Sequence, residues 1–284
     1  MILVGVIIFF IAIIIPEAAY AWGPATHLEL GREILNNAGL LAAPVRSLIE
    51  NFPYDFLYGN ISADIVVGKN LVEELKHCHN WKIGFRLLKK ARTDAQRAFA
   101  YGYLCHLACD TVAHNNFIPE MMIRSFSTTT LRHIYWELRF DAFVDKSVWQ
   151  IPKKMVKGMD MDDDALLDSV IEDTPLSFRT NKTIFSSVMT LKRFKVWHRM
   201  LGLVSNASRW KLPEEERVKY FRHAFDAAMG FLNHGHKAPC VKIDPTGKHS
   251  LNAAKFIRKK LKSARRQGRD WEGAMEKALN WVRL

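Results

Sequence analysis

One segment, from Thr93 to His114, limits the possible folds of this chain more than any other. Its apolar residues recur at helical spacing, and Thr93 or Asp94 fits the N-cap of a helix. His106, Asp110 and His114 follow one another at i, i+4 and i+8, so a helix projects all three from one face. Because the sequence around His106 and Asp110 is apolar, we expect burial, and burying a lone charge costs roughly several kcal/mol. The fold must therefore supply partners for these side chains.

A second pair repeats the same geometry. His133 and Glu137 are spaced i, i+4 on another predicted helix. Two such helices packed side by side could bring all five side chains together, and zinc accepts this mixture of imidazoles and carboxylates at about 2.0–2.2 Å. The alternative is a set of internal Asp–His pairs in the core, with no metal.

Further candidate ligands lie upstream. They are His27, Asp64, and the two histidines that flank Cys78, His77 and His79. By contrast, residues 138–197 contain none of the 11 histidines of the chain. The residue types that bind metal are thus concentrated between Trp22 and Glu137.

The rest of the chain predicts helices joined by short loops. Helical periodicity extends over residues 27–40, 130–148, 185–205 and 214–232, the last directly after Pro213. No stretch alternates apolar and polar residues long enough to indicate a sheet, so the fold class is all-α. The acidic residues 160–164 lack the spacing of a calcium loop and are typical of a solvated turn or a helix start.

The C-terminal part differs in composition. Residues 235–249 are interrupted by glycine and proline and are interpreted as a linker, and residues 251–284 form a basic amphipathic segment. This segment fits a packed helix pair with a solvated basic face, or a membrane-surface or anion-binding element. The expected organisation is a leader over residues 1–21, a helical domain over 22–234 and this C-terminal segment over 235–284.

The first residues resemble a signal peptide. The apolar run from Met1 to Ile15 is shorter than the roughly 20 residues that cross a membrane, and Ala19-Tyr20-Ala21 fits a cleavage site. No basic residue precedes the run, as one usually does, so an uncleaved anchor is the alternative. The pattern predicts an exported protein, periplasmic or secreted, whose mature chain begins at Trp22.

Charge and cysteine content restrict the partners. The formal net charge of +12 favours an anionic partner, either nucleic acid or an acidic membrane surface, and nothing indicates a protein partner. Cys105 and Cys109 lie four residues apart and share a helix face. We expect buried free thiols here and at Cys78 and Cys240 rather than a disulfide framework.

Several motifs occur in the order found in a known family. They are Trp22-Gly23-Pro24-Ala25-Thr26-His27, Gly59 to Asp64, His77-Cys78-His79-Asn80-Trp81, the H-x-x-x-D of His106 and Asp110, His114, and the H-x-x-x-E of His133 and Glu137. In this order the chain resembles the bacterial zinc-dependent phospholipases C.

The resemblance implies an all-helical domain with three zinc ions in one cleft between helices. Carried over by motif, the first zinc would be held by Trp22, His27 and Asp110. The second would be held by Asp64, His77, His106 and the bridging Asp110, with His79 competing for the place of His77. The third would be held by His114, His133 and Glu137. Asp64 is also the candidate for orienting or deprotonating the attacking water. Removal of the leader after Ala21 would free the Trp22 amine as a ligand.

Two departures keep other functions open. The step from Asp110 to His114 is short for the family, so either a loop is altered or the helix continues. The step from Trp22 to His27 is nearer that of the related helical single-strand nucleases, although Glu137 matches the phospholipases. The predicted activity is zinc-dependent hydrolysis of phospholipid head groups. The alternatives are a single-strand nuclease, with Tyr54, Phe56, Tyr58, Phe117 and Trp136 as possible stacking residues, and a non-catalytic zinc-binding protein.

Overall fold

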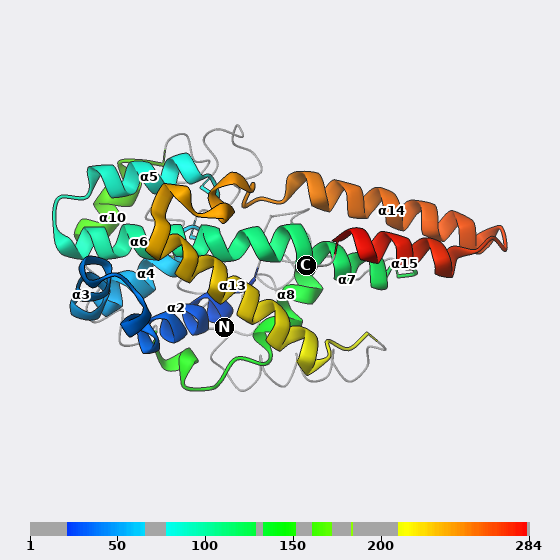
Figure 1. Cartoon of the computed structure of the whole chain (residues 1–284), viewed down its shortest axis with the longest axis horizontal. Helices are drawn as coiled ribbons and strands as arrows, with labels where there is room; N and C mark the ends of the chain where they lie inside the picture. Colours follow the sequence, from blue (N-terminus) through cyan, green and yellow to red (C-terminus); the bar gives the residue numbers. More distant parts are fainter. Residues whose placement is uncertain are drawn as a thin grey trace.

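The computed structural model describes residues 22–65, 78–128, 133–151, 161–171, 183 and 210–282, without the side chains of His133, Ile134, Trp149 and Met161. All regular structure in these ranges is helical (Figure 1), as the sequence predicts. The α-helices are α2 (Pro24–Asn36), α3 (Ala43–Asn51), α4 (Pro53–Ser62), α5 (Trp81–Lys90), α6 (Asp94–Val112), α7 (Ile118–Arg124), α8 (His133–Asp141), α10 (Met161–Asp168), α13 (Glu214–His234), α14 (Lys248–Arg266) and α15 (Trp271–Val282). Short helical turns cover Ala38–Leu40, Ala113–Phe117, Val148–Gln150, Gly235–Lys237 and Pro239–Lys242.

Helix α6 lies at the centre of the molecule, with α4, α5 and α13 packed around it (Figure 1). It begins with a capping box, in which Thr93 Oγ1 accepts from the Gln96 amide at 3.2 Å and the Gln96 side chain returns to the Thr93 amide. The N-cap is therefore Thr93, one of the two expected residues. From Gly102 onward every residue of α6 is buried, so the face that carries His106 and Asp110 lies inside the core.

Two glycines allow α4 and α6 to cross with their backbones in contact. A Cβ atom at Gly59 would lie 2.0 Å from the carbonyl oxygen of Phe99. A Cβ atom at Gly102 would lie 2.0 Å from the carbonyl oxygen of Phe56. Any larger residue at either position would push the helices apart. This close crossing places the end of α4, and the turn that carries Asp64, beside the buried face of α6.

Helix α6 does not end in a loop but continues through a π-helical turn, Ala113–Phe117, into α7. Pro119 gives a physical reason for the change of register, since proline has no amide hydrogen and its ring clashes with the carbonyl four residues earlier, that of Asn115. The Asn115 side chain donates to the Thr111 carbonyl at 2.9 Å across the turn. Of the two explanations for the short step from Asp110 to His114, the continuing helix is the one observed.

Some expected boundaries differ. The helix expected over residues 130–148 is described only as His133–Asp141, and it is followed by a turn in which the Asp145 carboxylate accepts from the Ser147 amide at 2.8 Å. The acidic segment does start a helix, α10, but Asp163 is buried and Asp164 accepts from the Tyr58 hydroxyl, so it is not simply solvated. The helix expected over 185–205 lies outside the described residues.

The C-terminal helices α14 and α15 form a pair that packs on α7 and projects at one end of the molecule (Figure 1). The segment expected as a linker forms two short helical turns, Gly235–Lys237 and Pro239–Lys242, before α14 begins. In the part of the chain that is described, none of the helices combines the length and the apolar character needed to traverse a bilayer.

Candidate metal centre

Helix α2 positions His27, and a distant residue fixes the start of this helix. Gly23 at the N-cap has no side chain to accept a hydrogen bond. Instead, the Asp141 carboxylate from α8 accepts from both the amide (3.1 Å) and the hydroxyl (2.7 Å) of Thr26. A carboxylate at this point also interacts favourably with the positive end of the helix dipole. Trp22, fully buried, stacks on Phe140 of α8 with ring centroids 4.6 Å apart, so the segment before α2 is held from the same side.

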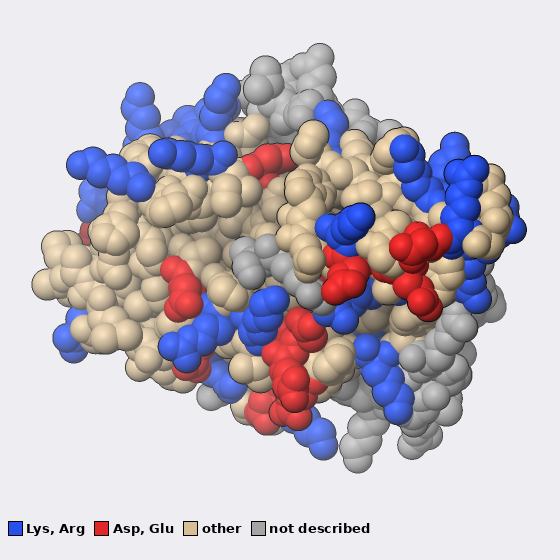
Figure 2. Space-filling view, turned by 45° about the vertical axis from the view of Figure 1, so that its right-hand side comes forward, with Lys and Arg blue, Asp and Glu red and all other residues tan. Residues whose placement is uncertain are grey.

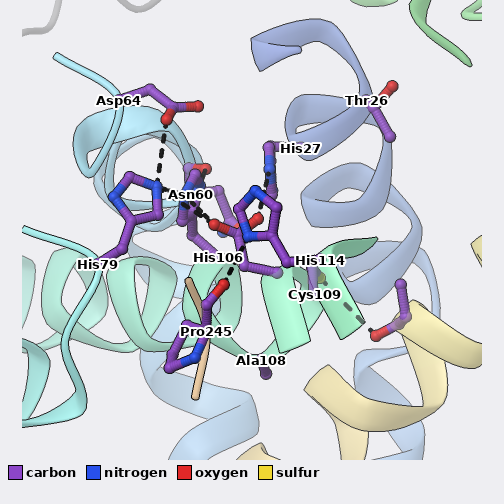
Figure 3. A network of polar contacts seen from close by, with 12 residues as sticks. Thr26, His27, Asn60, Asp64, His79, His106, Ala108, Cys109, His114 and Pro245 are labelled. Atoms are coloured by element: carbon purple, nitrogen blue, oxygen red, sulfur yellow. Dashed lines mark hydrogen bonds and ion pairs between the residues drawn. The ribbon is translucent and has the colours of Figure 1, made fainter. Parts of the chain in front are cut away.

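Asp110 lies at the centre of a buried cluster of imidazoles. Its Oδ1 is 3.3 Å from His27 Nε2, and its Oδ2 is 3.2 Å from His79 Nε2 and 3.3 Å from His106 Nε2. On the far side of His79, Asp64 Oδ1 lies 3.3 Å from the same Nε2 atom. Figure 3 shows Asp64, His79, His106 and His27 directed toward one another from four separate segments of the chain.

The ring nitrogens of this cluster face each other as well as the carboxylates. His106 Nδ1 lies 2.8 Å from the Asn60 carbonyl oxygen, which can only accept, so Nδ1 carries the hydrogen. In the neutral ring, Nε2 of His106 then presents a lone pair, and it lies 3.1 Å from His79 Nε2. His27 stacks on His106 with ring centroids 3.9 Å apart. Imidazole nitrogens and carboxylate oxygens thus converge on one buried volume.

The protonation states suit metal binding. Burial alone would raise the pKa of Asp110, but the three surrounding imidazoles, His106 above all, outweigh it and hold this pKa well below its ordinary value. Burial lowers the pKa of His27, and the neighbouring His106 lowers it further. A charged carboxylate beside a neutral imidazole is the ligand state that a divalent metal requires.

Unsatisfied atoms give a direct test of whether a cation fits. Both ring nitrogens of His27 and both oxygens of Asp110 are buried without a hydrogen-bond partner among the described residues. Two sets of ligand atoms each lie within 4.8 Å of one another, one from His27, His106 and Asp110 and the other from Asp64, His79 and His106. A cation between these atoms would satisfy them, so the residues present fit a zinc site.

The remaining predicted ligands are placed as follows. His114 and Glu137 are both buried, with His114 on the π-helical turn and Glu137 on α8. The side chain of His133, and all of His77, lie outside the described residues. Of the two histidines that flank Cys78, the structure therefore describes only His79, and it lies inside the cluster. Trp22 contributes a core side chain, and its expected ligand atoms are those of the backbone.

The segment interpreted from the sequence as a linker, residues 235–249, also reaches the site. His114 Nδ1 lies 2.5 Å from the carbonyl oxygen of Pro245, which fixes the orientation of the ring (Figure 3). Gly247 follows with a φ of 57°, and a Cβ atom there would lie 2.4 Å from His114 Cβ. The only sequence signal was the pairing of proline and glycine, which indicates a turn but not its neighbour. The same holds for Asn60, which acts through its backbone carbonyl, and for Asp141.

Comparison with known proteins agrees with this geometry. A family model described as zinc-dependent phospholipase C matches residues 26–184, more than half of the chain and all of the predicted side-chain ligands from His27 to Glu137. No curated protein and no solved structure gives a significant match. The four cysteines are buried and free, as expected. The helical fold, the buried cluster of histidines and aspartates and the family match lead to one conclusion: this chain belongs to the zinc-dependent phospholipase C family.

Proposed function

We propose that this protein uses zinc to hydrolyse the phosphodiester bond of phospholipid head groups. The observation that carries the proposal is the arrangement around Asp110, whose two carboxylate oxygens face different imidazoles at 3.2–3.3 Å in a fully buried setting. Such a setting is costly for an Asp–His core pair and well suited to more than one cation.

The ligand chemistry divides this cluster between two zinc ions. An imidazole nitrogen has one lone pair and binds one metal, whereas a carboxylate can bind one metal through each oxygen. His106 Nε2 therefore belongs with His79 and Asp64 on the Oδ2 side of Asp110. His27 belongs to the Oδ1 side, where the backbone of Trp22 would complete the ligand set as in the family. Asp110 would be the ligand shared by both sites.

When bound, zinc lowers the pKa of a coordinated water and neutralises charge that develops on phosphoryl oxygens. The residues of this chain hold and orient the reacting groups. The carbonyl of Asn60 orients His106, and the carbonyl of Pro245 orients His114. Asp64, buried at the edge of the cluster, is our candidate for accepting the proton of the attacking water.

The third zinc would be held by His114, His133 and Glu137. His114 Nδ1 faces a carbonyl oxygen and carries the hydrogen, so the other ring nitrogen, Nε2, would be the metal ligand. Glu137 contributes a buried carboxylate from α8. This third ion is the one whose ligands depend most on the C-terminal half of the chain.

The proposal favours a lipid over a nucleic acid for a specific reason. Four of the five aromatic residues considered for base stacking, Phe56, Tyr58, Phe117 and Trp136, are buried in the core. Tyr54 is the exception and is exposed. Stacking of unpaired bases requires accessible rings, so these side chains support the core rather than a single-strand nuclease site.

The test combines metal content with turnover. We expect two to three zinc ions per chain by elemental analysis and release of the phosphorylated head group from phosphatidylcholine vesicles. Zinc together with cleavage of single-stranded DNA, but no lipid turnover, would make the protein a nuclease. Tight zinc with neither activity would identify a non-catalytic zinc protein. A chain that stays free of zinc after dialysis against the metal would contradict the whole proposal.

Export is part of the same proposal. Residues 1–21 lie outside the described residues, and the cleavage signal at Ala19-Tyr20-Ala21 supports removal of a leader. N-terminal sequencing of the protein recovered from outside the cytoplasm should then begin at Trp22. An intact Met1 on an active, fully metallated enzyme would show that the Trp22 amine is not a ligand.

A further inference from the structure

The α14–α15 pair carries an unusual share of the charge of this protein. Residues 248–282 contain ten Lys and Arg residues and three Asp and Glu residues, a net of +7 out of +12 for the whole chain. Helix α14 alone has eight basic residues and no acidic one. Figure 2 shows Lys and Arg side chains gathered at the right-hand end of the molecule, where this pair lies in Figure 1, with acidic side chains beside them.

The basic residues of α14 divide into two groups with different environments. Arg258 and Lys262 are partly buried, and both donate to the carbonyl oxygen of Thr128 after α7, at 3.0 and 2.9 Å. They sit beside the buried Leu251, Ala254 and Leu261, which attach the helix to the body of the protein. These two cations are thus part of the packing and stabilise the position of the helix.

The second group forms the outer face of α14, which we define as Lys255, Phe256, Lys259 and Lys260. These residues follow helical spacing, and all of them are exposed. The Phe256 ring is 59% exposed, an unusual position for a large apolar side chain, and Lys260 Nζ lies 4.8 Å from its centroid. The outer face thus combines an apolar ring with three surrounding cations and has no acidic residue.

We propose that the outer face of α14 docks this protein on an anionic phospholipid bilayer. Near an anionic surface each lysine contributes roughly 1 kcal/mol of attraction, and Phe256 can enter the interface between head group and acyl chain. A purely electrostatic contact would need no exposed phenylalanine, and a purely apolar protein interface would exclude three lysines. The combination fits a lipid surface, which has both charge and an accessible apolar interior.

The position of α14 in the fold indicates how docking would serve catalysis, and this step rests on the proposed function. Helix α14 begins at Lys248, directly after Gly247, whose Cα lies against the candidate ligand His114. The docking helix and the metal centre therefore share one short connection. Attachment through α14 would keep the site at the surface where its lipid substrate is concentrated.

The experiment compares vesicle binding by the mature protein, two triple variants and one single variant. Vesicles of phosphatidylcholine alone are compared with vesicles that also contain phosphatidylserine, by co-sedimentation at low and at physiological salt. Lys255→Gln/Lys259→Gln/Lys260→Gln should bind the anionic vesicles about 100-fold more weakly, the loss expected from three lysines. Phe256→Ser should weaken binding by about tenfold and retain its salt dependence.

The matched control removes three exposed cations from α5, at the other end of the molecule in Figure 1: Lys82→Gln/Arg86→Gln/Lys89→Gln. It should change binding less than threefold. An equal loss in both triple variants would show diffuse attraction and overturn the proposal. So would equal binding to both kinds of vesicle, or a loss confined to single-stranded DNA binding while vesicle binding persists.

This design tests the docking proposal and the proposed catalytic function independently. Turnover of a short-chain phospholipid below its micellar concentration should be unchanged in the α14 triple variant, whereas turnover on anionic vesicles should fall with binding. If the wild-type chain docks but hydrolyses neither substrate, the proposed function is wrong and the docking surface stands. If it hydrolyses both and the variant loses neither binding nor vesicle turnover, the docking surface is wrong.

Discussion

Helices α6 and α14 are each 19 residues long, and they accommodate charge in opposite ways. In α6 a single carboxylate, Asp110, is enclosed with no solvent contact, and three imidazoles surround it. In α14 most of the eight basic residues face water, and Arg258 and Lys262 donate to the Thr128 carbonyl. The buried cluster around Asp110 holds its side chains in fixed positions. The exposed Lys and Arg side chains of α14 are long and can change conformation.

This difference explains what each helix can recognise. A buried charge is tolerated only where specific partners stand at bonding distance, so the proposed metal site at α6 would select by geometry and admit a small cation. Exposed cations cost little and act through summed attraction, so the outer face of α14 selects by charge density and admits an extended surface. The predictions below test this comparison, in order of decreasing effect.

The largest effect is expected from Asp110→Asn. An amide cannot bridge two cations, so zinc content should fall to one ion or none per chain, and lipid turnover should fall by about 10³-fold or more. Elemental analysis and a head-group release assay measure both. Asp226→Asn on the neighbouring α13 changes an exposed carboxylate and is the control. Zinc content near that of wild type in the Asp110 variant would disprove the bridging role.

A second change tests the close crossing of helices α4 and α6. Gly102→Ala places a methyl group 2.0 Å from the Phe56 carbonyl oxygen, so we expect a loss of about 1–3 kcal/mol in the free energy of unfolding. Thermal unfolding with zinc present should show a Tm lower by several degrees. Gly230→Ala in α13 is the control, because nothing lies within 4 Å of its Cβ position. That variant should be more stable by about 0.5–1 kcal/mol. Equal Tm values for the two variants would mean that α4 and α6 do not need their close approach.

The third change separates backbone strain from contact with the site. Gly247→Ala and Gly268→Ala both put a side chain at positive φ, 57° and 65°, but only the first meets His114. Both should lose about 1–2 kcal/mol of stability from the backbone. Only Gly247→Ala should also weaken binding of one zinc ion, by about 10–100-fold. Titration with a competing chelator measures the zinc affinity. Identical affinities in the two variants would show that the loop around Gly247 does not contribute to the site.

The smallest effect concerns a buried charge that the protein satisfies without metal. Glu120 of α7 accepts from Tyr220 and Arg124; burial would raise its pKa, but these partners hold it below the ordinary value. A depressed acid pKa contributes stability above the unfolded value, near 4.5, which is lost as pH falls through the folded value. Glu120→Gln should therefore flatten the fall in stability below about pH 4.5. Urea unfolding across pH 3–6 tests this, and an unchanged pH profile would contradict it.

The sequence predicted the parts of the fold that depend on local spacing. Helix α6, an N-cap at Thr93 or Asp94 and the inward face of His106 and Asp110 follow from periodicity and from the cost of burying charge, and the structure has Thr93 as the cap. The sequence did not decide between an altered loop and a continuing helix after Asp110. The effect of Pro119 on the preceding carbonyl depends on whether the chain continues as a helix. The early end of α8 at Asp141 was missed, since the Asp145 turn competes with a pattern that still looks helical.

The missed parts of the candidate site share a physical cause. Pro245 and Asn60 act through backbone carbonyl oxygens, which every residue possesses. Their residue types therefore do not predict these contacts. The Asp141 carboxylate caps helix α2 by accepting from Thr26, 115 residues earlier in the chain. The spacing of residues along the sequence does not predict a contact over this distance. The resemblance left His77 and His79 as alternatives. The structure describes His79 inside the cluster, and its description of the chain does not extend to His77.

The long-range contacts of the site also set the order in which it can form during synthesis. The Thr26 amide meets its acceptor only after Asp141 has been made, and His114 meets Pro245 only 131 residues after its own addition. A nascent chain that ends before Pro245 holds the candidate ligand side chains but lacks the carbonyl that orients His114. The contact that orients His114 in the candidate site can therefore form only after residue 245 has been synthesised.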